Sequence, residues 1–183
     1  MNNKVFFMLA NGFEIVEAMA PLDVLRRVGV QVITVSISDN IEVESAQKVK
    51  IIADTTIEKV NFGEGDAVIL PGGSPGYINL RENQIVIDIV KEYLDSDKIV
   101  GAICGAPTVL GVNNLINDYK FTCHSSVIDE MNSNNYIDED IVEDRNLITG
   151  VGAGRSLDFG FALAKRFVSD DKIYMVKRGM ELV

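Results

Sequence analysis

The sequence predicts an α/β fold in which a mostly parallel sheet is covered by helices. Short apolar runs of strand length alternate along the chain with helical patterns, which is typical of parallel strands joined by crossover helices. Hydrophobic residues make up 47% of the 183 and charged residues 24%, as in ordinary globular proteins. The length suffices for one domain with a substantial core, so we expect residues 1–183 to form a single domain.

The expected strands are buried runs that are apolar or rich in β-branched residues. The first run is too short for a signal peptide or a membrane span, so we interpret it as a strand. The strands predicted in this way are Lys4–Leu9, Gln31–Ser36, Ala67–Leu70, Ile99–Ile103, Leu147–Thr149 and a short one at Tyr119–Cys123. Residues 41–52 predict a polar hairpin or short excursion, and the acidic stretch Asp138–Asp144 predicts a solvated loop or an edge.

Four segments have the pattern of helices. Glu14–Arg27 is followed by Gly29, a residue suited to ending a helix, and Pro107 suits the first turn of another. The remaining two are Ile85–Leu94 and Leu157–Val168. The run GVGAG before the last helix lacks the third glycine of a dinucleotide fingerprint, because Leu157 occupies that position. We interpret it as a turn and expect no bound cofactor.

Charge and cysteine content exclude several classes of partner. The net charge of −10 argues against binding to nucleic acid or to anionic membranes, which need a basic face. One histidine and no CxxC pair leave too few ligands for zinc, so no metal site is expected. Two cysteines and no export signal are typical of the reducing cytoplasm.

The segment IVGAICGAPTVL holds the strongest local signal for chemistry. A buried strand ends at Cys104, two small residues follow, and proline opens a helix. A side chain on such a turn lies at the carboxyl end of the sheet, where open α/β folds bind ligands. The helix N-terminus should lower the pKa of the thiol, and Gly105 could present an N–H group to an oxyanion. The alternative is a small buried cysteine of the core.

A nucleophilic elbow also implies strain, so we expect Cys104 in a sparsely populated backbone conformation. His124 is the only histidine of the chain and follows a predicted strand. It is either a partner of the cysteine or a surface loop residue, since spacing alone does not decide. Cys123 is adjacent, and neighbouring strand residues face opposite sides, so we interpret it as a core residue.

Glu17 lies on an otherwise apolar helix stripe with Phe13, Ala20, Val24 and Val28. Burial there would raise its pKa and make the group a proton donor or shuttle. The alternative is a carboxylate at the edge of the stripe that reaches water. The turn PGGSPG after a buried strand could present main-chain N–H groups to an oxyanion, or could simply be a turn that needs glycine.

These pieces together resemble the ThiJ/PfpI superfamily, and within it the branch of the parkinsonism-associated protein deglycase. The resemblance covers nearly the whole chain. It rests on the combination, in this order, of KVFFMLANGFEIVEAMAPLDVLRRVG, LPGGSPG, AICGAP, the run ending in His124 and ITGVGAGRSLDFGFALA.

The resemblance implies a flavodoxin-like three-layer sandwich and a homodimer with the first helix near the interface. It implies that Cys104 is the elbow cysteine, Glu17 the carboxyl group that hydrogen-bonds its thiolate, and His124 the nearby histidine, with Gly73 and Gly105 as oxyanion donors. Two departures stand out. The elbow reads Cys-Gly-Ala-Pro where that branch usually has Cys-Ala-Gly-Pro, and Gln47 and Lys48 occupy a region that carries arginine in some relatives.

The function expected from the resemblance is cysteine-dependent, glutathione-independent conversion of α-oxoaldehydes such as methylglyoxal, or deglycation of their protein adducts. The first alternative is an oxidative-stress sensor or chaperone without turnover, in which Cys104 is oxidised. A peptidase or amidase is less favoured, because those relatives place histidine directly after the cysteine and Gly105 stands there in this chain.

Overall fold

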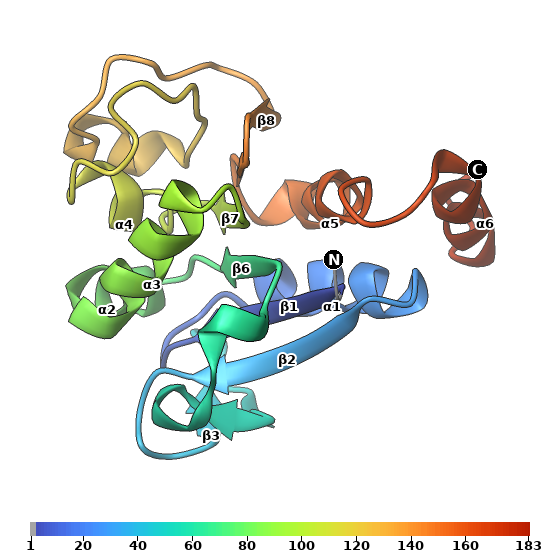
Figure 1. The fold of residues 1–183 in the computed structure, drawn as a ribbon, viewed down its shortest axis with the longest axis horizontal. Coiled ribbons are helices and arrows are strands. Elements are labelled where there is room, and N and C mark those ends of the chain that lie inside the picture. Colours follow the sequence, from blue (N-terminus) through green and yellow to red (C-terminus); the bar gives the residue numbers. More distant parts are fainter. Residues whose placement is uncertain (1–2) are drawn as a thin grey trace.

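The computed structural model describes residues 3–183, which build a seven-stranded sheet (Figure 1). The strand order is β5-β2-β1-β6-β7-β9-β8, and all neighbours are parallel except β8 and β9. The strands are β1 (Lys4–Leu9), β2 (Gln31–Ser36), β5 (Thr55–Thr56), β6 (Ala67–Leu70), β7 (Ile99–Ile103), β8 (Ile141–Asp144) and β9 (Leu147–Gly150). The predicted mostly parallel α/β sheet is therefore confirmed.

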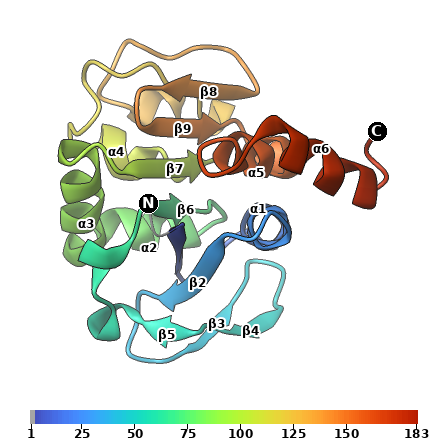
Figure 2. The same ribbon diagram turned by 45° about the vertical axis from the view of Figure 1, so that its right-hand side comes forward.

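Helices cover both faces of this sheet and complete a three-layer sandwich (Figure 2). One face carries α1 (Ile15–Arg27), α5 (Ser156–Ala164) and α6 (Asp170–Gly179); the other carries α2 (Gly76–Glu82), α3 (Gln84–Asp95) and α4 (Thr108–Gly111). Short 3₁₀-helices occupy Ile57–Lys59, Phe62–Glu64, Ser125–Glu130 and Ala153–Arg155. Among residues 3–183, no helix has both the length and the apolar character that crossing a membrane requires.

The alternation of side chains along β1 shows why the sheet needs two helical layers. Val5 and Phe7 pack in the core on the side of α1 and α5, whereas Phe6 and Met8 pack in the core on the side of α3. All four are nearly or fully buried, as expected for a central strand of a parallel sheet.

Close packing between α1 and α5 fixes the position of the first helix. Gly160 of α5 lies against Pro21 of α1, and a Cβ atom added at Gly160 would be 2.8 Å from the Pro21 Cα. That distance is shorter than Cβ atoms tolerate, so this glycine permits the two backbones to approach. Helix α1 carries Glu17, and its fixed position in turn fixes the carboxyl group.

The predicted hairpin at residues 41–52 is confirmed as the antiparallel pair β3 (Glu42–Glu44) and β4 (Lys50–Ile52). Ser45 in its turn forms a bridge with Phe13, and the Ala46 N–H donates to the Phe13 carbonyl at 2.9 Å. The hairpin is therefore attached to the segment that leads into α1.

The strand predicted at Tyr119–Cys123 is wrong. Phe121 forms only an isolated bridge with Tyr136. The physical reason is that β8 already pairs with the outer edge of β9, so this segment cannot join the sheet beside β9. The acidic stretch that contains β8 is accordingly an edge, one of the two outcomes expected for it.

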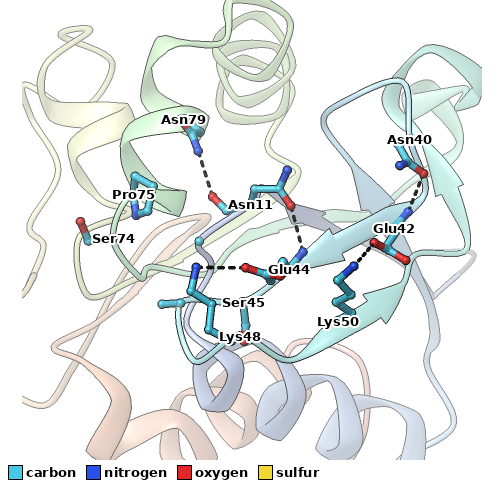
Figure 3. A pocket seen from close by; sticks show the side chains of 12 residues that line it. Asn11, Asn40, Glu42, Glu44, Ser45, Lys48, Lys50, Ser74, Pro75 and Asn79 are labelled. Atoms are coloured by element: carbon cyan, nitrogen blue, oxygen red, sulfur yellow. Dashed lines mark hydrogen bonds and ion pairs between the residues drawn. The ribbon is translucent and has the colours of Figure 1, made fainter.

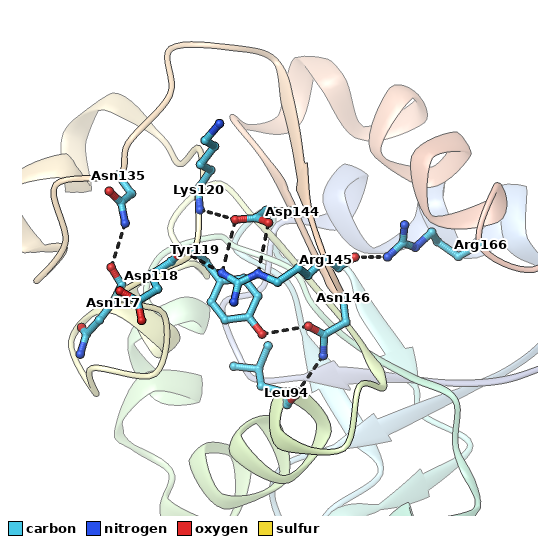
Figure 4. A network of polar contacts seen from close by, with 10 residues as sticks. All are labelled: Leu94, Asn117, Asp118, Tyr119, Lys120, Asn135, Asp144, Arg145, Asn146 and Arg166. Carbon is cyan, nitrogen blue, oxygen red and sulfur yellow. Dashed lines mark hydrogen bonds and ion pairs between the residues drawn. The ribbon is translucent and has the colours of Figure 1, made fainter.

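A polar network replaces strand pairing in this region (Figure 4). The buried Asn146 side chain donates to the carbonyls of Leu94 and Lys98, and its oxygen accepts from the Tyr119 hydroxyl at 2.9 Å. The Arg145 guanidinium lies 3.5 Å from the centre of the Tyr119 ring. Side chains rather than a ladder therefore anchor this loop.

Two predicted helices differ in length from the observed ones. The helix after Pro107 is the four-residue α4, and Asn114 just beyond it has the left-handed φ of 57° that ends a helix. The last predicted helix is α5, which ends at Ala164 rather than Val168.

Candidate functional site

The candidate site lies at the carboxyl ends of the adjacent strands β6 and β7, beside the start of α1. Gly72 and Gly73 follow β6, and Cys104 follows β7 directly. Glu17 reaches the same place from the first turns of α1. This is the edge of a parallel α/β sheet at which ligands bind.

Cys104 has a φ of 65°, in the left-handed region that residues with a Cβ rarely adopt. The strained backbone predicted for this residue is therefore confirmed. Hydrogen bonds hold it on both sides: the Cys104 N–H donates to the Gly150 carbonyl, and its carbonyl accepts from the His124 N–H, each at 2.9 Å. The surrounding structure thus fixes the direction of the thiol.

Glu17 is fully buried, so of the two interpretations of its sequence position the buried one is correct. Its Oε2 accepts from the Gly72 N–H at 2.8 Å, and its carboxyl group hydrogen-bonds the Cys104 side chain. No nitrogen or oxygen partner among the described residues satisfies Oε1. Burial raises the pKa of Glu17 from 4.5 to about 7.

The lowered thiol pKa expected from the helix N-terminus is wrong. Burial and, after it, the negative charge of Glu17 together raise the pKa of Cys104 to about 12, although the N–H groups of Gly105 and Gly73 act to lower it. Helix α4 has only four residues, so its dipole is small, and desolvation dominates. Moving the thiol proton onto Glu17 removes the carboxylate charge that opposes the thiolate.

The turn after β6 requires glycine twice. A Cβ atom at Gly72 would lie 2.6 Å from Glu17 Oε2 and 2.7 Å from Cys104 Cβ. Gly73 has a φ of 91°, and a Cβ atom there would lie 2.1 Å from the backbone nitrogen of Glu14. The interpretation as a turn that needs glycine is confirmed, and the same glycines let the backbone reach the thiol; the role of its N–H groups as oxyanion donors stays a prediction.

Gly105 explains the departure at the elbow. A Cβ atom at this position would lie 2.7 Å from two ring carbons of Tyr77, which comes from α2. Glycine directly after Cys104 thus leaves room for the aromatic ring that packs beside the elbow.

His124 is exposed and lies at the same pocket as Cys104. Its Nδ1 accepts from the Ser126 N–H at 3.2 Å and lies 2.8 Å from the Ser126 hydroxyl. A backbone N–H can only donate, so the neutral imidazole carries its proton on Nε2. The second nitrogen of His124 is therefore a hydrogen-bond donor.

Cys123 is completely buried in the core, which confirms its interpretation as a packing residue. Burial raises the pKa of its thiol to about 12. Of the two cysteines, only Cys104 is partly exposed and lines a pocket.

A pocket of about 380 Å³ opens above the thiol. It brings together four of the five predicted site residues, and Glu17 lies beneath it. Its lining comprises Glu14, Gly73, Ser74, Tyr77, Cys104, Gly105, His124, Ser126 and Val127. The sequence analysis did not single out Glu14, Ser74, Tyr77, Ser126 or Val127 as site residues. Two signals were available: Ser74 lies in the PGGSPG turn, and Glu14 lies between the first strand and the first helix. Within residues 3–183, no three His, Cys, Asp or Glu side chains converge as metal ligands would.

Gln47 and Lys48 have different partners. The Gln47 amide donates to Glu14 Oε2 at 2.6 Å, at the mouth of this pocket. Lys48 pairs with Glu44 at 3.0 Å in a second, polar pocket between the hairpin and α2 (Figure 3). Of the two residues in the region where some relatives carry arginine, only Gln47 contacts the site.

Fold and site together define an α/β sandwich protein with a strained cysteine at a strand-to-helix elbow beside a buried carboxyl group. The profile of the DJ-1/PfpI family matches residues 3–166. The chain belongs to this family, and its sandwich is the flavodoxin-like one of the family.

Known relatives agree with this assignment. Protein dj-1beta of Drosophila melanogaster is 30% identical over 98% of this chain and 97% of its own length. The glutathione-independent glyoxalase DJR-1.2 of Caenorhabditis elegans is 30% identical over 87% of this chain and 85% of its own. The chain spans only 39% of the length of DJ-1 homolog B from Arabidopsis thaliana, which is 29% identical.

Among solved structures, a cysteine-to-alanine mutant of a DJ-1 superfamily protein from Salmonella typhimurium superimposes with a TM-score of 0.95. It is 32% identical, and the match covers 98% of both chains.

Proposed function

We propose that this protein is a cysteine-dependent, glutathione-independent glyoxalase that converts methylglyoxal and related α-oxoaldehydes into 2-hydroxy acids. One observation carries the proposal: the strained Cys104 thiol hydrogen-bonds a buried carboxyl group whose pKa is raised to about 7. A carboxyl group with a pKa near neutrality can both accept and return a proton under physiological conditions. The name of the Caenorhabditis elegans relative supports the same activity.

The first step forms a bond between sulfur and the aldehyde carbon. Glu17 accepts the thiol proton, and the Cys104 sulfur adds to the aldehyde, which gives a hemithioacetal. The N–H groups of Gly73 and Gly105, which already contact the sulfur, stabilise the developing oxyanion. Glu17 then returns the proton to this oxygen and is again a carboxylate.

The second step moves hydrogen between the two former carbonyl carbons. Glu17 removes the proton from the carbon attached to sulfur, which gives an enediolate, and delivers it to the neighbouring carbon. The hydroxyl proton moves to the neighbouring oxygen, so the product is a thioester of the 2-hydroxy acid. His124 Nε2–H serves as a hydrogen-bond donor to the enediolate, since its Nδ1 is occupied as an acceptor. Water then cleaves the thioester and releases lactate and the thiol, so the balance is methylglyoxal plus water to lactic acid.

The proposal is tested by incubating purified protein with methylglyoxal, without glutathione or added metal, and measuring lactate. We expect Cys104→Ser to abolish turnover and Glu17→Gln to lower kcat by 10²-fold or more, the contribution typical of a general base. Cys123→Ser is the matched control, since this cysteine is in the core. Absence of lactate with freshly reduced wild-type protein would refute the activity.

Deglycation of protein adducts would use the same thiol and carboxyl group, with the adduct in place of the free aldehyde. We rank it below the glyoxalase reaction, because a pocket of about 380 Å³ is suited to a small substrate. The reaction needs a reduced thiol, and both cysteines are free, so we place the protein in the reducing cytoplasm.

The unpartnered Oε1 of Glu17 favours a second candidate, a redox sensor or stress-regulated chaperone. A protonated Glu17 could donate from this oxygen to a sulfinate on Cys104 and stabilise the oxidised state. Oxidation that changes a partner interaction, in a protein without turnover, would support the sensor instead of the enzyme. Peptidase activity remains the least favoured, since Gly105 follows the cysteine and His124 is held by Ser126.

A further inference from the structure

Glu14 brings a negative charge to the mouth of the Cys104 pocket. Of the nine described residues that line this pocket, none is lysine or arginine, and Glu14 is the one carboxylate. The other polar lining groups are hydroxyls and the His124 imidazole. In the lining that this chain supplies, a ligand that approaches the thiol therefore meets one negative charge without a compensating cation.

The position of Glu14 is held from both the backbone and the side chain. Its N–H donates to the Gly72 carbonyl at 2.9 Å, which ties it to the turn beside the thiol. Its Oε2 accepts from the Gln47 amide at 2.6 Å, and the Gln47 oxygen accepts from the Ile15 N–H at 3.3 Å. Gln47 thus orients the carboxylate without neutralising it.

The cations of the neighbouring hairpin are paired elsewhere. The Lys48 Nζ lies 3.0 Å from Glu44 Oε1, and the Lys50 Nζ lies 2.8 Å from Glu42 Oε1. Both pairs line the polar pocket between the hairpin and α2 (Figure 3). The Glu14 charge also reaches the reacting groups. Burial is the main cause of the raised pKa of Glu17, and the negative charge of Glu14 adds to it.

We propose that Glu14 is a specificity-determining residue that selects neutral oxoaldehydes against anionic ones. This rests on the proposed function and names its substrate class: methylglyoxal and glyoxal would enter, whereas oxoaldehydes that carry a separate carboxylate, such as 4,5-dioxopentanoate, would be disfavoured by repulsion. The same repulsion acts on the 2-hydroxy acid anion and favours its release. Charge at the mouth acts over a few ångströms, where salt screens it least.

The test uses two alkylating reagents of nearly equal size that differ in charge, iodoacetamide and iodoacetate. Each reacts at Cys104 by displacement of iodide, and the ratio of their rates cancels the fraction of thiolate. We expect wild-type protein to favour iodoacetamide more strongly than a free thiol does. In Glu14→Gln the ratio should fall about three- to tenfold at low ionic strength, the size of effect expected for one nearby charge.

Two further variants complete the design. Glu14→Asp keeps the charge and should keep the wild-type ratio, and Glu58→Gln removes an exposed carboxylate outside the pocket and should also leave it unchanged. A ratio in Glu14→Gln equal to that of wild type, or a fall of equal size in Glu58→Gln, would overturn the proposal.

A substrate arm separates this inference from the glyoxalase proposal. If the enzyme turns over, Glu14→Gln should raise kcat/KM for 4,5-dioxopentanoate, an oxoaldehyde whose carboxylate lies away from the reacting carbons, relative to the neutral 2-oxopentanal by a similar factor. If wild-type protein shows no turnover, the glyoxalase proposal fails, but the alkylation ratio still measures whether Glu14 excludes anions from the thiol.

Discussion

At the scale of single residues, one proton shared between Glu17 and Cys104 governs the site. Both groups are removed from water, and burial raises the pKa of each, so neither gains from being charged while the other is charged. The carboxyl group has the lower pKa, so near neutral pH it loses its proton while the thiol keeps one, and its hydrogen bond to the thiol puts this carboxylate in place as the acceptor when sulfur attacks. The state of Glu17 should therefore be visible in stability as well as in activity.

Glu17→Gln should change how stability depends on pH. The pKa of Glu17 rises from 4.5 to about 7 on folding, so between these values the folded protein binds more protons than the unfolded chain. Stability is then present below pH 4.5 and is lost as pH rises through 7, by about 3 kcal/mol. Glutamine cannot ionise and keeps the acceptor for Gly72, so the variant should lack this loss.

The measurement is urea unfolding of both proteins at pH 5 and pH 8, with Cys104→Ala as a background in which no thiol interacts with the carboxyl group. The difference in free energy of unfolding between Glu17→Gln and wild type should shift in favour of the variant at pH 8. An identical difference at the two pH values would show that Glu17 is ionised throughout.

At the scale of elements, the contact between α2 and the elbow places Tyr77 in the wall of the Cys104 pocket. Gly105→Ala should destabilise the protein by about 1–3 kcal/mol, the usual cost of overpacking, because the new Cβ meets the Tyr77 ring at 2.7 Å. Tyr77→Ala removes that ring. The double variant should therefore be more stable than the sum of the two single effects predicts, by 1 kcal/mol or more.

Thermal or urea unfolding of the four proteins in this cycle measures the coupling, and the rate of Cys104 alkylation reports whether the elbow is displaced. Gly111→Ala is a poor control, since Met131 packs there, whereas Gly154 has open space around it and Gly154→Ala suits the purpose. Strict additivity of the Gly105 and Tyr77 effects would contradict the steric explanation.

A comparison of the predicted and observed elements shows which parts of the fold were predictable from the sequence. Strands β1, β2, β6 and β7 have the predicted bounds: β6, β7 and all of β1 after Lys4 are continuous buried runs, and β2 is an alternating, β-branched strand, so in each the sequence pattern and the secondary structure agree. Helix α2 was missed because it begins inside the glycine- and proline-rich turn that ends β6, and α6 was missed because its residues are largely exposed. Residues 119–123 form no strand beside β9 because β8 already pairs with β9 there. The local sequence of this segment does not contain that information.

For the candidate site, too, some features were predictable from the local sequence and others depend on tertiary packing. The local sequence was enough to predict Cys104 as the candidate residue and to predict its strained backbone, since a buried strand ends there in a tight turn. The burial of Glu17 was predictable as one of two outcomes, because its stripe is otherwise apolar. The raised thiol pKa was not, because it depends on how much water the fold removes and on the distance to a carboxyl group from another element. Tyr77 and Ser126 join the pocket only through packing.

At the scale of the whole molecule, the homodimer implied by the family resemblance stays a prediction, with the first helix as its expected interface. Helix α1 exposes Val16, 47% accessible, and the adjacent hairpin exposes Ile52, 65% accessible. A small apolar cluster joins this helix to the hairpin. The half-buried side chains of Ile15, Met19 and Ile51 pack against its buried residues. An apolar surface shared by two elements is typical of an interface between subunits.

We expect sedimentation equilibrium to give twice the chain mass of 20.1 kDa for the wild-type protein. Val16→Asp should raise the dissociation constant of the dimer at least tenfold, since a charge buried in an interface without a partner is costly. Ile85→Asp is the matched control: Ile85 is 48% accessible on α3, on the opposite layer, and the substitution there should leave the mass unchanged. A wild-type protein that sediments as a single chain would exclude the dimer, and equal effects of the two substitutions would show that the interface is not at α1.

Glu14 and Glu17 flank Val16 on the chain, so the alkylation rate of Cys104 should also be measured in Val16→Asp. A rate that changes when the dimer is lost would show that assembly affects the site.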